Sequence, residues 1–245
     1  MLVAYDGTGF HGFAEQDGQR TVGGVLREAI ERVVRHPVQL TCAGRTDRGV
    51  HAWGQVVSLD LDIDCDLEAL HRSLQKLCGP EVVVREVARA LPDFDARFSA
   101  TSRTYRYTVV NRPLPDPFLV RTAWHVVPPL DPELLALACD PFLGEHDFSA
   151  FCRRPKPGPD GAPVSLRRRV LDARWADLGD DVLRFEITAT AFCHQMVRSI
   201  VGTAVAAGHG QLRAGDIRGI LRSGDRSNAA PIAPPQGLCL WHVGY

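Results

Sequence analysis

The chain has 245 residues, of which 45% are hydrophobic and 23% charged, and its formal net charge is −1. This apolar content can bury one large core or two smaller ones, and the balanced charge excludes a disordered chain. No apolar stretch approaches the roughly 20 residues that a membrane-spanning helix needs. Polar residues also follow Met1 too early for a signal peptide. Composition therefore predicts a globular cytoplasmic protein that does not enter a membrane.

The seven cysteines are scattered and never spaced as C-x-x-C. This pattern suits a reducing compartment and argues against a zinc site or a disulfide framework. Cys193 and His194 are adjacent, but an isolated pair in a helical stretch is more typical of packing than of metal ligation. We therefore expect neither a metal nor a cofactor.

The predicted elements of the first half begin with a strand at residues 1–5. A helix with one apolar stripe follows at 22–35, then strands at 38–43 and 53–60, a helix at 67–77 and a strand at 82–89. Helices and strands alternate along this half. The first half therefore predicts an α+β domain over residues 1–100.

The second half repeats this order in outline. It contains predicted strands at 103–111 and 122–127, a helix at 131–139, strands at 168–176 and 182–190, helices at 192–208 and 215–223, and a strand at 238–243. Proline and glycine at 153–163 predict an irregular loop there. The pattern predicts a second α+β domain over residues 101–245, with mainly antiparallel sheets in both halves.

Charge is unevenly placed along the chain. Residues 97–174 carry twelve basic and eight acidic side chains, a local charge of +4 in a chain whose net charge is −1. A protein that docks one face of an RNA needs such a local basic surface rather than a basic average. Alternatively, Arg167, Arg168 and Arg169 form an ordinary solvated strand face.

A turn at residues 44–51 holds the strongest candidates for catalytic side chains. It places Asp47 between two predicted strands, with Gly44 and Gly49 allowing a tight backbone. Such turns on a rigid scaffold often hold catalytic side chains. Alternatively, Asp47 caps the turn and Arg45 forms a surface ion pair.

The string G-R-T-D-R-G-V-H at residues 44–51 closely resembles the signature of the TruA family of tRNA pseudouridine synthases, whose aspartate is the catalytic nucleophile. Five further blocks resemble the family in the same order: Y-D-G-T-G-F-H-G (5–12), F-D-A-R-F-S-A (94–100) with R-T-Y-R-Y (103–107), G-E-H-D-F-S-A-F (144–151), F-C-H-Q-M-V-R-S-I-V-G (192–202) and A-P-P-Q-G-L (233–238). The resemblance covers essentially the whole chain.

This resemblance implies a fold and an activity. The fold is the pseudouridine synthase fold, with two ferredoxin-like halves, adjoining sheets and an active-site cleft between them. The activity is isomerisation of uridine to pseudouridine in the anticodon stem-loop of tRNA (tRNA positions 38–40), without a cofactor, by a homodimer. A base inside a stack is out of reach of a side chain, so the enzyme must flip it.

The resemblance also assigns roles to single residues. Asp47 is the nucleophile, Arg198 is its cationic partner, Tyr105 stacks on the target base and Arg45 helps to displace it. Arg97, Arg103 and Arg106 are weaker candidates for phosphate binding. From the residues alone, Tyr105 could instead be core packing, since it shares a strand face with Tyr107. The alternative for Arg198 is a purely structural carboxylate partner, and His51 is better interpreted as a turn-stabilising residue than as an acid or base.

Four segments depart from the family pattern. They are Phe13–Ala14, residues 75–80, Asp95 and residues 166–169. None of them removes Asp47, Tyr105 or Arg198, but they leave open a shifted RNA target. A catalytically silent RNA-binding protein is therefore the alternative function. A glycoside hydrolase would need a second carboxylate, and none accompanies Asp47 in the motif.

Overall fold

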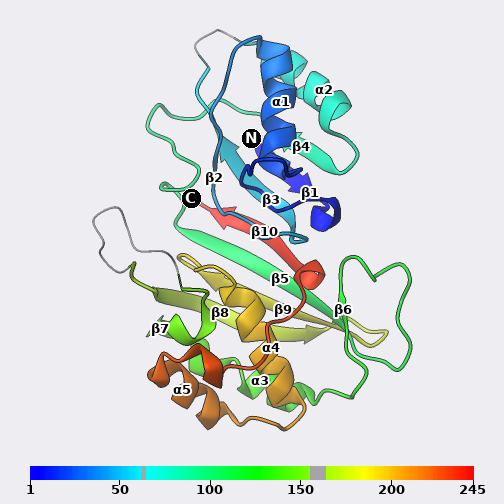
Figure 1. Ribbon diagram of the computed structural model, residues 1–245, viewed down its shortest axis with the longest axis vertical. Coiled ribbons are helices and arrows are strands. Elements are labelled where there is room, and N and C mark those ends of the chain that lie inside the picture. The colour runs from blue at the N-terminus through cyan, green and yellow to red at the C-terminus, as the bar shows by residue number, and fades with distance from the viewer. Residues whose placement is uncertain (62–64, 155–163) are drawn as a thin grey trace. The chain divides into compact units, whose positions relative to one another are not determined.

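A computed structural model describes residues 1–61, 65–154 and 164–245 (Figure 1). By their internal contacts these residues form two compact units. Unit 1 comprises Met1–Arg103 together with Cys239–Tyr245, and unit 2 comprises Thr104–Leu238. The final strand thus belongs to the same unit as the first, and the division into two halves at residue 100 stays a prediction.

Unit 1 has the element order strand, helix, strand, strand, helix, strand. The elements are β1 (Leu2–Tyr5), α1 (Val22–Val34), β2 (Thr41–Cys42), β3 (His51–Ser58), α2 (Leu67–Cys78) and β4 (Val82–Glu86), with β10 (Leu238–Gly244) added from the end of the chain. Antiparallel pairing gives the order β4-β1-β3. The far edge of β3 is shared, since one part pairs antiparallel with β2 and the other part pairs parallel with β10. The β4-β1-β3-β2 order is that of a ferredoxin-like sheet.

Both helices of unit 1 begin at a side-chain cap. Thr21 Oγ1 accepts a hydrogen bond from the Gly24 N–H at 3.2 Å, and Asp66 Oδ1 accepts from the N–H groups of Glu68 and Ala69 at 2.9 and 3.0 Å. The helices pack side by side (Figure 1). Their apolar stripes are buried, through Leu26 and Ile30 in α1 and Leu70 and Leu74 in α2. These amphipathic helices therefore supply the core of unit 1.

Unit 2 is built on mainly antiparallel strands. Its elements are β5 (Ser102–Val110), β6 (Trp124–His125), α3 (Pro132–Leu137), β7 (Gly144–Asp147), β8 (Arg167–Asp177), β9 (Val182–Ala189), α4 (Met196–Gly208) and α5 (Ala214–Ser223). The strand order is β5-β9-β8-β7, and β6 pairs parallel with β5. The β8–β9 hairpin pairs Ala173 with Ile187 and Trp175 with Phe185.

Helix α4 forms the core of unit 2. Met196, Ile200 and Ala204 are at most 1% exposed, and α3 packs beside the helix. A second apolar cluster joins the rings of Phe142, Phe148 and Phe151, with centroids 5.1 to 6.5 Å apart. Such contacts fix the position of α4 and of the residues that precede it.

The predicted α+β class with mainly antiparallel pairing is confirmed, and so is the apolar stripe of α1. Several element predictions differ from the structure. Helix α4 begins at Met196 rather than at residue 192, because Gln195 adopts a left-handed conformation with φ 68°. The strands predicted at 38–43 and 122–127 are only two residues long, as β2 and β6, and β7 was not predicted. Most of the loop predicted at 153–163 lies outside the described residues.

Candidate active site

The turn that carries Asp47 connects β2 and β3 in unit 1. Asp47 is half-buried, and its carbonyl oxygen accepts a hydrogen bond from the Val50 N–H at 3.1 Å. Gly49 has φ 76°, a left-handed conformation that glycine adopts without strain. The Gly49 N–H donates to the Phe10 carbonyl at 3.3 Å. The turn is thus tight and tied to the segment that follows β1.

The opening motif holds this turn by close backbone approach. A Cβ atom at Gly12 would lie 2.6 Å from the Thr46 carbonyl oxygen, and one at Gly7 would lie 2.0 Å from the Val50 carbonyl oxygen. The Phe13 N–H donates to the same Thr46 oxygen at 3.1 Å. The two motifs therefore form one structural unit, which only glycine at positions 7 and 12 permits.

A buried polar network lies behind the turn. Tyr5 Oη and Thr46 Oγ1 are 2.8 Å apart, and Gln55 Nε2 donates to Tyr5 Oη and to the Gly44 carbonyl at 3.3 and 2.6 Å. Gln55 is fully buried. Gln55 is not among the predicted site residues, although a polar residue inside an apolar strand is a signal for such a network. The network fixes both ends of the segment that carries Arg45 and Asp47.

His51 also supports the turn. It is 6% exposed, and its Nδ1 atom accepts a hydrogen bond from the Gly7 N–H at 3.0 Å. The Asp6 carboxylate lies 3.1 Å from the same nitrogen. Since the Gly7 N–H can only donate, Nδ1 is the acceptor in that hydrogen bond. This contact supports the interpretation of His51 as a turn-stabilising residue.

The three arginines proposed in unit 1 differ in environment. Arg45 and Arg97 are exposed, and the Arg97 guanidinium lies 5.2 Å from the ring centroid of Phe98. Arg103 is buried and donates hydrogen bonds of 2.6 to 3.3 Å to the carbonyl oxygens of Ala43, Arg97 and Ala100. Its guanidinium therefore anchors the residue that precedes the Asp47 turn.

Two of the departures from the family pattern have a local structural account. Phe13 is 3% exposed, with its ring centroid 6.3 Å from that of Tyr5. Asp95 Oδ1 accepts hydrogen bonds from the N–H groups of Arg97 and Phe98 at 2.7 and 2.8 Å. Both residues therefore stabilise the segments in which they lie.

In unit 2, the two tyrosines of β5 have different surroundings. Tyr105 is 8% exposed and packs edge to face with Phe192, with ring centroids 5.0 Å apart. Tyr107 is fully buried and donates to the Pro234 carbonyl at 2.8 Å. Burial raises the pKa of Tyr107 well above its usual range, and the positive charge of Arg198 acts in the opposite direction. Tyr107 is thus a core residue that lies near Arg198.

Arg198 lies in the first turn of α4 and is half-buried. Its Nε–H donates to the Ala233 carbonyl at 2.8 Å, and the Ala233 N–H donates to the Arg198 carbonyl at 3.1 Å. One turn on, a Cβ atom at Gly202 would lie 2.0 Å from the Pro231 carbonyl oxygen. The helix and the segment at 231–233 therefore lie in backbone contact, and this contact orients Arg198.

Arg106 belongs to an ion-pair row on the sheet of unit 2. Its Nε atom lies 2.6 Å from Glu186 Oε2, and Arg174 bridges Glu186 and Asp172. Arg167 lies 3.1 Å from Glu145 on the neighbouring strand. These pairs place several of the basic side chains of residues 97–174 beside acidic ones, so the local charge is partly balanced within unit 2.

The structure groups the predicted site residues by unit. Asp47 and Arg45 share one turn in unit 1, and Arg97 and Arg103 belong to the same unit. Tyr105, Arg106 and Arg198 belong to unit 2, where Tyr107 links the strand of Tyr105 to the region of Arg198. The pairing of Asp47 with Arg198 stays a prediction.

Cys152 and Cys193 form a disulfide in unit 2, with Cα atoms 5.8 Å apart. The sequence argued against a disulfide framework and did not indicate this single bond, because folding brings together residues 41 positions apart. In residues 1–61, 65–154 and 164–245, no group of three or more His, Cys, Asp or Glu side chains could hold a metal ion. No helix in this described part of the chain is long and apolar enough to cross a membrane.

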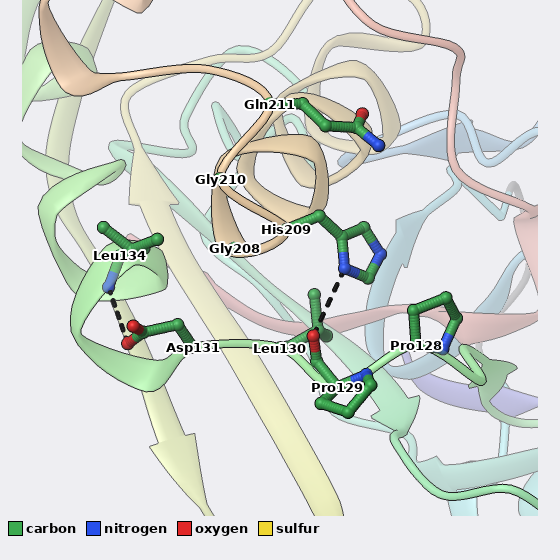
Figure 2. Close-up of a pocket in the computed structure, with 9 residues that line it drawn as sticks. All are labelled: Pro128, Pro129, Leu130, Asp131, Leu134, Gly208, His209, Gly210 and Gln211. Atoms are coloured by element: carbon green, nitrogen blue, oxygen red, sulfur yellow. Dashed lines mark hydrogen bonds between the residues drawn. The ribbon is translucent and has the colours of Figure 1, made fainter.

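A cavity lies elsewhere in unit 2. It has a volume of about 670 Å³ and lies between the segment before α3 and the end of α4, lined by residues such as Pro129, Asp131 and His209 (Figure 2). Asp131 caps α3 through the Leu134 N–H, and the His209 ring is directed toward the Pro129 carbonyl. None of the predicted site residues lines this cavity, so it is not the candidate active site.

Comparison with known proteins agrees with the motifs. The family model described as tRNA pseudouridine synthase matches residues 1–99 and 138–245. A tRNA pseudouridine synthase A of Methylobacterium nodulans is 42% identical over 250 residues, covering 100% of this chain and 94% of the relative. Proteins of the same name from Frankia casuarinae and Thermosynechococcus vestitus are 43% and 38% identical, covering 99% and 100% of this chain and 87% and 84% of the relatives. The chain belongs to the tRNA pseudouridine synthase family.

Proposed function

We propose that the protein isomerises uridine to pseudouridine in the anticodon stem-loop of tRNA, with Asp47 as the nucleophile. The observation that carries this proposal is the Asp47 turn itself. An aspartate presented on a turn held by two glycine contacts and a buried hydrogen-bond network has a fixed backbone position, as a catalytic group requires. Membership of the family supports the substrate class.

The reaction is an isomerisation, so no electrons or groups are exchanged with a second substrate. The bond from C1′ to N1 of uracil breaks, the base turns, and a bond from C1′ to C5 forms while C5 loses its proton and N1 gains one. A carboxylate can serve this sequence by attacking carbon or by taking a proton. Asp47 performs the first step in either case.

The remaining residues act on the flipped base and on the carboxylate. Tyr105 provides an aromatic face for the displaced uracil, an interaction of about 1–3 kcal/mol. Arg198 favours the charged form of Asp47, and Arg45 helps to displace the base. Arg97 binds phosphate from its exposed position. Arg103 acts as a positioning residue, since its donors are engaged with backbone carbonyls.

The deciding experiment is tritium release from tRNA labelled at C5 of uridine. The hydrogen at C5 is lost only when C5 becomes the new attachment point, so release reports pseudouridine formation directly. We expect release with the wild type and none with Asp47→Asn. Asp47→Ala should retain tRNA affinity, measured by filter binding. A loss of tRNA affinity as large as the loss of turnover would contradict the role of Asp47 as nucleophile.

The alternative of a silent RNA-binding protein predicts a different pattern. It requires tRNA binding by the wild type without release from any tRNA pool. Tyr105→Leu tests the proposed stacking of the target base, because it removes the aromatic face. Tyr105→Phe keeps the ring and serves as the control. We expect about a tenfold loss in kcat/KM for Tyr105→Leu and little change for Tyr105→Phe.

We further propose a cytoplasmic homodimer, as the resemblance implies, since tRNA is found in that compartment. Sedimentation velocity at working concentration tests the quaternary state. A species of twice 26.9 kDa is expected, and a single monomeric species across the concentration range would contradict the dimer.

A further inference from the structure

Cys152 and Cys193 join two segments of unit 2, and the segment of Cys193 contacts Tyr105 through Phe192. Cys152 directly follows the buried Phe151, and Cys193 lies between Phe192 and the start of α4. The Arg153 N–H donates to the His194 carbonyl at 3.0 Å, so the two segments are also tied by their backbones. This hydrogen bond keeps the two cysteines in register whether or not the sulfur atoms are bonded.

The Cys193 segment is directly coupled to the proposed base-binding tyrosine. Phe192 packs edge to face with Tyr105 at 5.0 Å, and Tyr105 is only 8% exposed. A uracil that stacks on Tyr105 therefore needs the neighbouring ring to give way. On the other side of Cys193, its carbonyl accepts from the Met196 N–H at 3.1 Å, at the start of the helix that carries Arg198.

We propose that Cys152 and Cys193 form a reversible thiol–disulfide pair that controls the entry of the target base beside Tyr105. The disulfide ties Cys193, and with it Phe192, to the buried Cys152 and so opposes the shift that admits the base. The dithiol form releases this restraint and is the active one. This inference rests on the proposed function, because it assigns regulation to the same Tyr105 site.

The oxidant is a low-molecular-weight disulfide such as glutathione disulfide. Cys193 is half-buried and Cys152 is 2% exposed, so Cys193 is the thiol that a small molecule reaches. The Cys193 thiolate attacks one sulfur atom of glutathione disulfide and releases one glutathione. The Cys152 thiolate then attacks the Cys193 sulfur atom and releases the second. Two protein thiols are oxidised, two glutathione thiols are formed, and the protons pass to the leaving thiolates.

Three of the five other cysteines are poor competitors for this reaction. Burial raises the pKa of Cys42 and Cys78 to about 11 and that of Cys139 to about 12, so these thiols are almost fully protonated near neutral pH. The Cα atoms of Cys152 and Cys193 are 5.8 Å apart, a separation that a disulfide spans without backbone movement. Geometry therefore selects this pair.

The test compares the full chain after incubation with dithiothreitol and with glutathione disulfide. Peptide mapping without reduction identifies the Cys152–Cys193 bond, and tritium release gives KM and kcat for both forms. We expect oxidation to raise KM for tRNA about 5-fold or more, with a smaller effect on kcat. Cys193→Ser and Cys152→Ala should have the KM of the reduced wild type, and glutathione disulfide should not change it. Cys65→Ser is the control: it replaces another half-buried cysteine, and its KM should still rise on oxidation.

Each remaining outcome decides the proposal. Both cysteines still free after treatment, or a disulfide formed with unchanged KM, would overturn it while leaving the proposed function intact. Lack of tritium release from both forms would overturn the proposed function instead. The affinities of the two forms for tRNA, measured by filter binding, would then decide whether the pair controls access: equal affinities would refute it.

Discussion

At the scale of single residues, the Asp47 turn depends on two glycines, because a side chain at either position would not fit against it. Gly7 and Gly12 lie so close to the Asp47 turn that any Cβ atom would collide with a backbone carbonyl. Backbone atoms cannot move aside as a flexible side chain can, so such collisions displace the turn itself. The opening motif therefore positions the backbone of the Asp47 turn by close packing.

Gly7→Ala tests this contact. The added methyl group meets the Val50 carbonyl at 2.0 Å, so we expect a loss of about 1–3 kcal/mol in the free energy of unfolding, together with reduced turnover. Gly215→Ala in α5 is the matched control, since nothing lies within 4 Å of its Cβ position. It should stabilise the protein by up to about 1 kcal/mol. Urea unfolding measures both, and a wild-type midpoint for Gly7→Ala would refute the contact.

Tyr245 gives a prediction about pH. Burial raises its pKa to about 12, and its hydroxyl donates to the Ala96 carbonyl at 2.8 Å. Because the pKa is higher in the folded than in the unfolded chain, the neutral phenol stabilises the fold below pH about 10. This contribution disappears as the pH rises from about 10 to 12. The difference in phenolate absorbance between wild type and Tyr245→Phe should titrate near 12; a midpoint near 10 would contradict the assigned surroundings.

At the scale of elements, amphipathic helices with clear caps were predictable, and short polar elements were not. Helix α2 spans 67–78, close to the predicted 67–77. It was predictable because Asp66 caps it and because Leu70 and Leu74 form its buried stripe. Strand β7 consists of Gly-Glu-His-Asp, without apolar alternation, and exists only through its pairing with β8. Local sequence therefore cannot reveal β7.

Asp66→Ala tests the cap of α2. It leaves the N–H groups of Glu68 and Ala69 without their carboxylate partner, which should cost about 0.5–2 kcal/mol in the free energy of unfolding. Asn caps about as well as Asp, so Asp66→Asn is the control and should lie close to the wild type. Thermal unfolding followed by circular dichroism measures both. Equal losses for the two variants would show that charge, rather than capping, is responsible.

At the scale of the whole molecule, binding of tRNA must come from local charge, since the net charge is −1. Exposed and ion-paired arginines differ in what they can offer to phosphate. Arg97 is exposed, whereas Arg106 is held by Glu186 at 2.6 Å. An arginine already engaged with a carboxylate releases fewer counterions when RNA binds.

The salt dependence of tRNA affinity separates these two residues. Arg97→Gln should reduce the slope of log affinity against log salt concentration by about 1, and Arg106→Gln should leave it nearly unchanged. Filter binding over a series of salt concentrations provides the slopes. A larger reduction for Arg106→Gln than for Arg97→Gln would reverse the assignment.

The sequence by itself determined the family, the α+β class and the identity of the candidate residues, since each rests on short strings or on periodicity that neighbouring residues define. Only the tertiary structure decided how these residues are supported. Three contacts join positions far apart in the chain: Gln55 with Tyr5, Arg103 with the Ala43 carbonyl, and Cys152 with Cys193. Long-range contacts of this kind arise when packing brings separate elements together, and no local pattern encodes them.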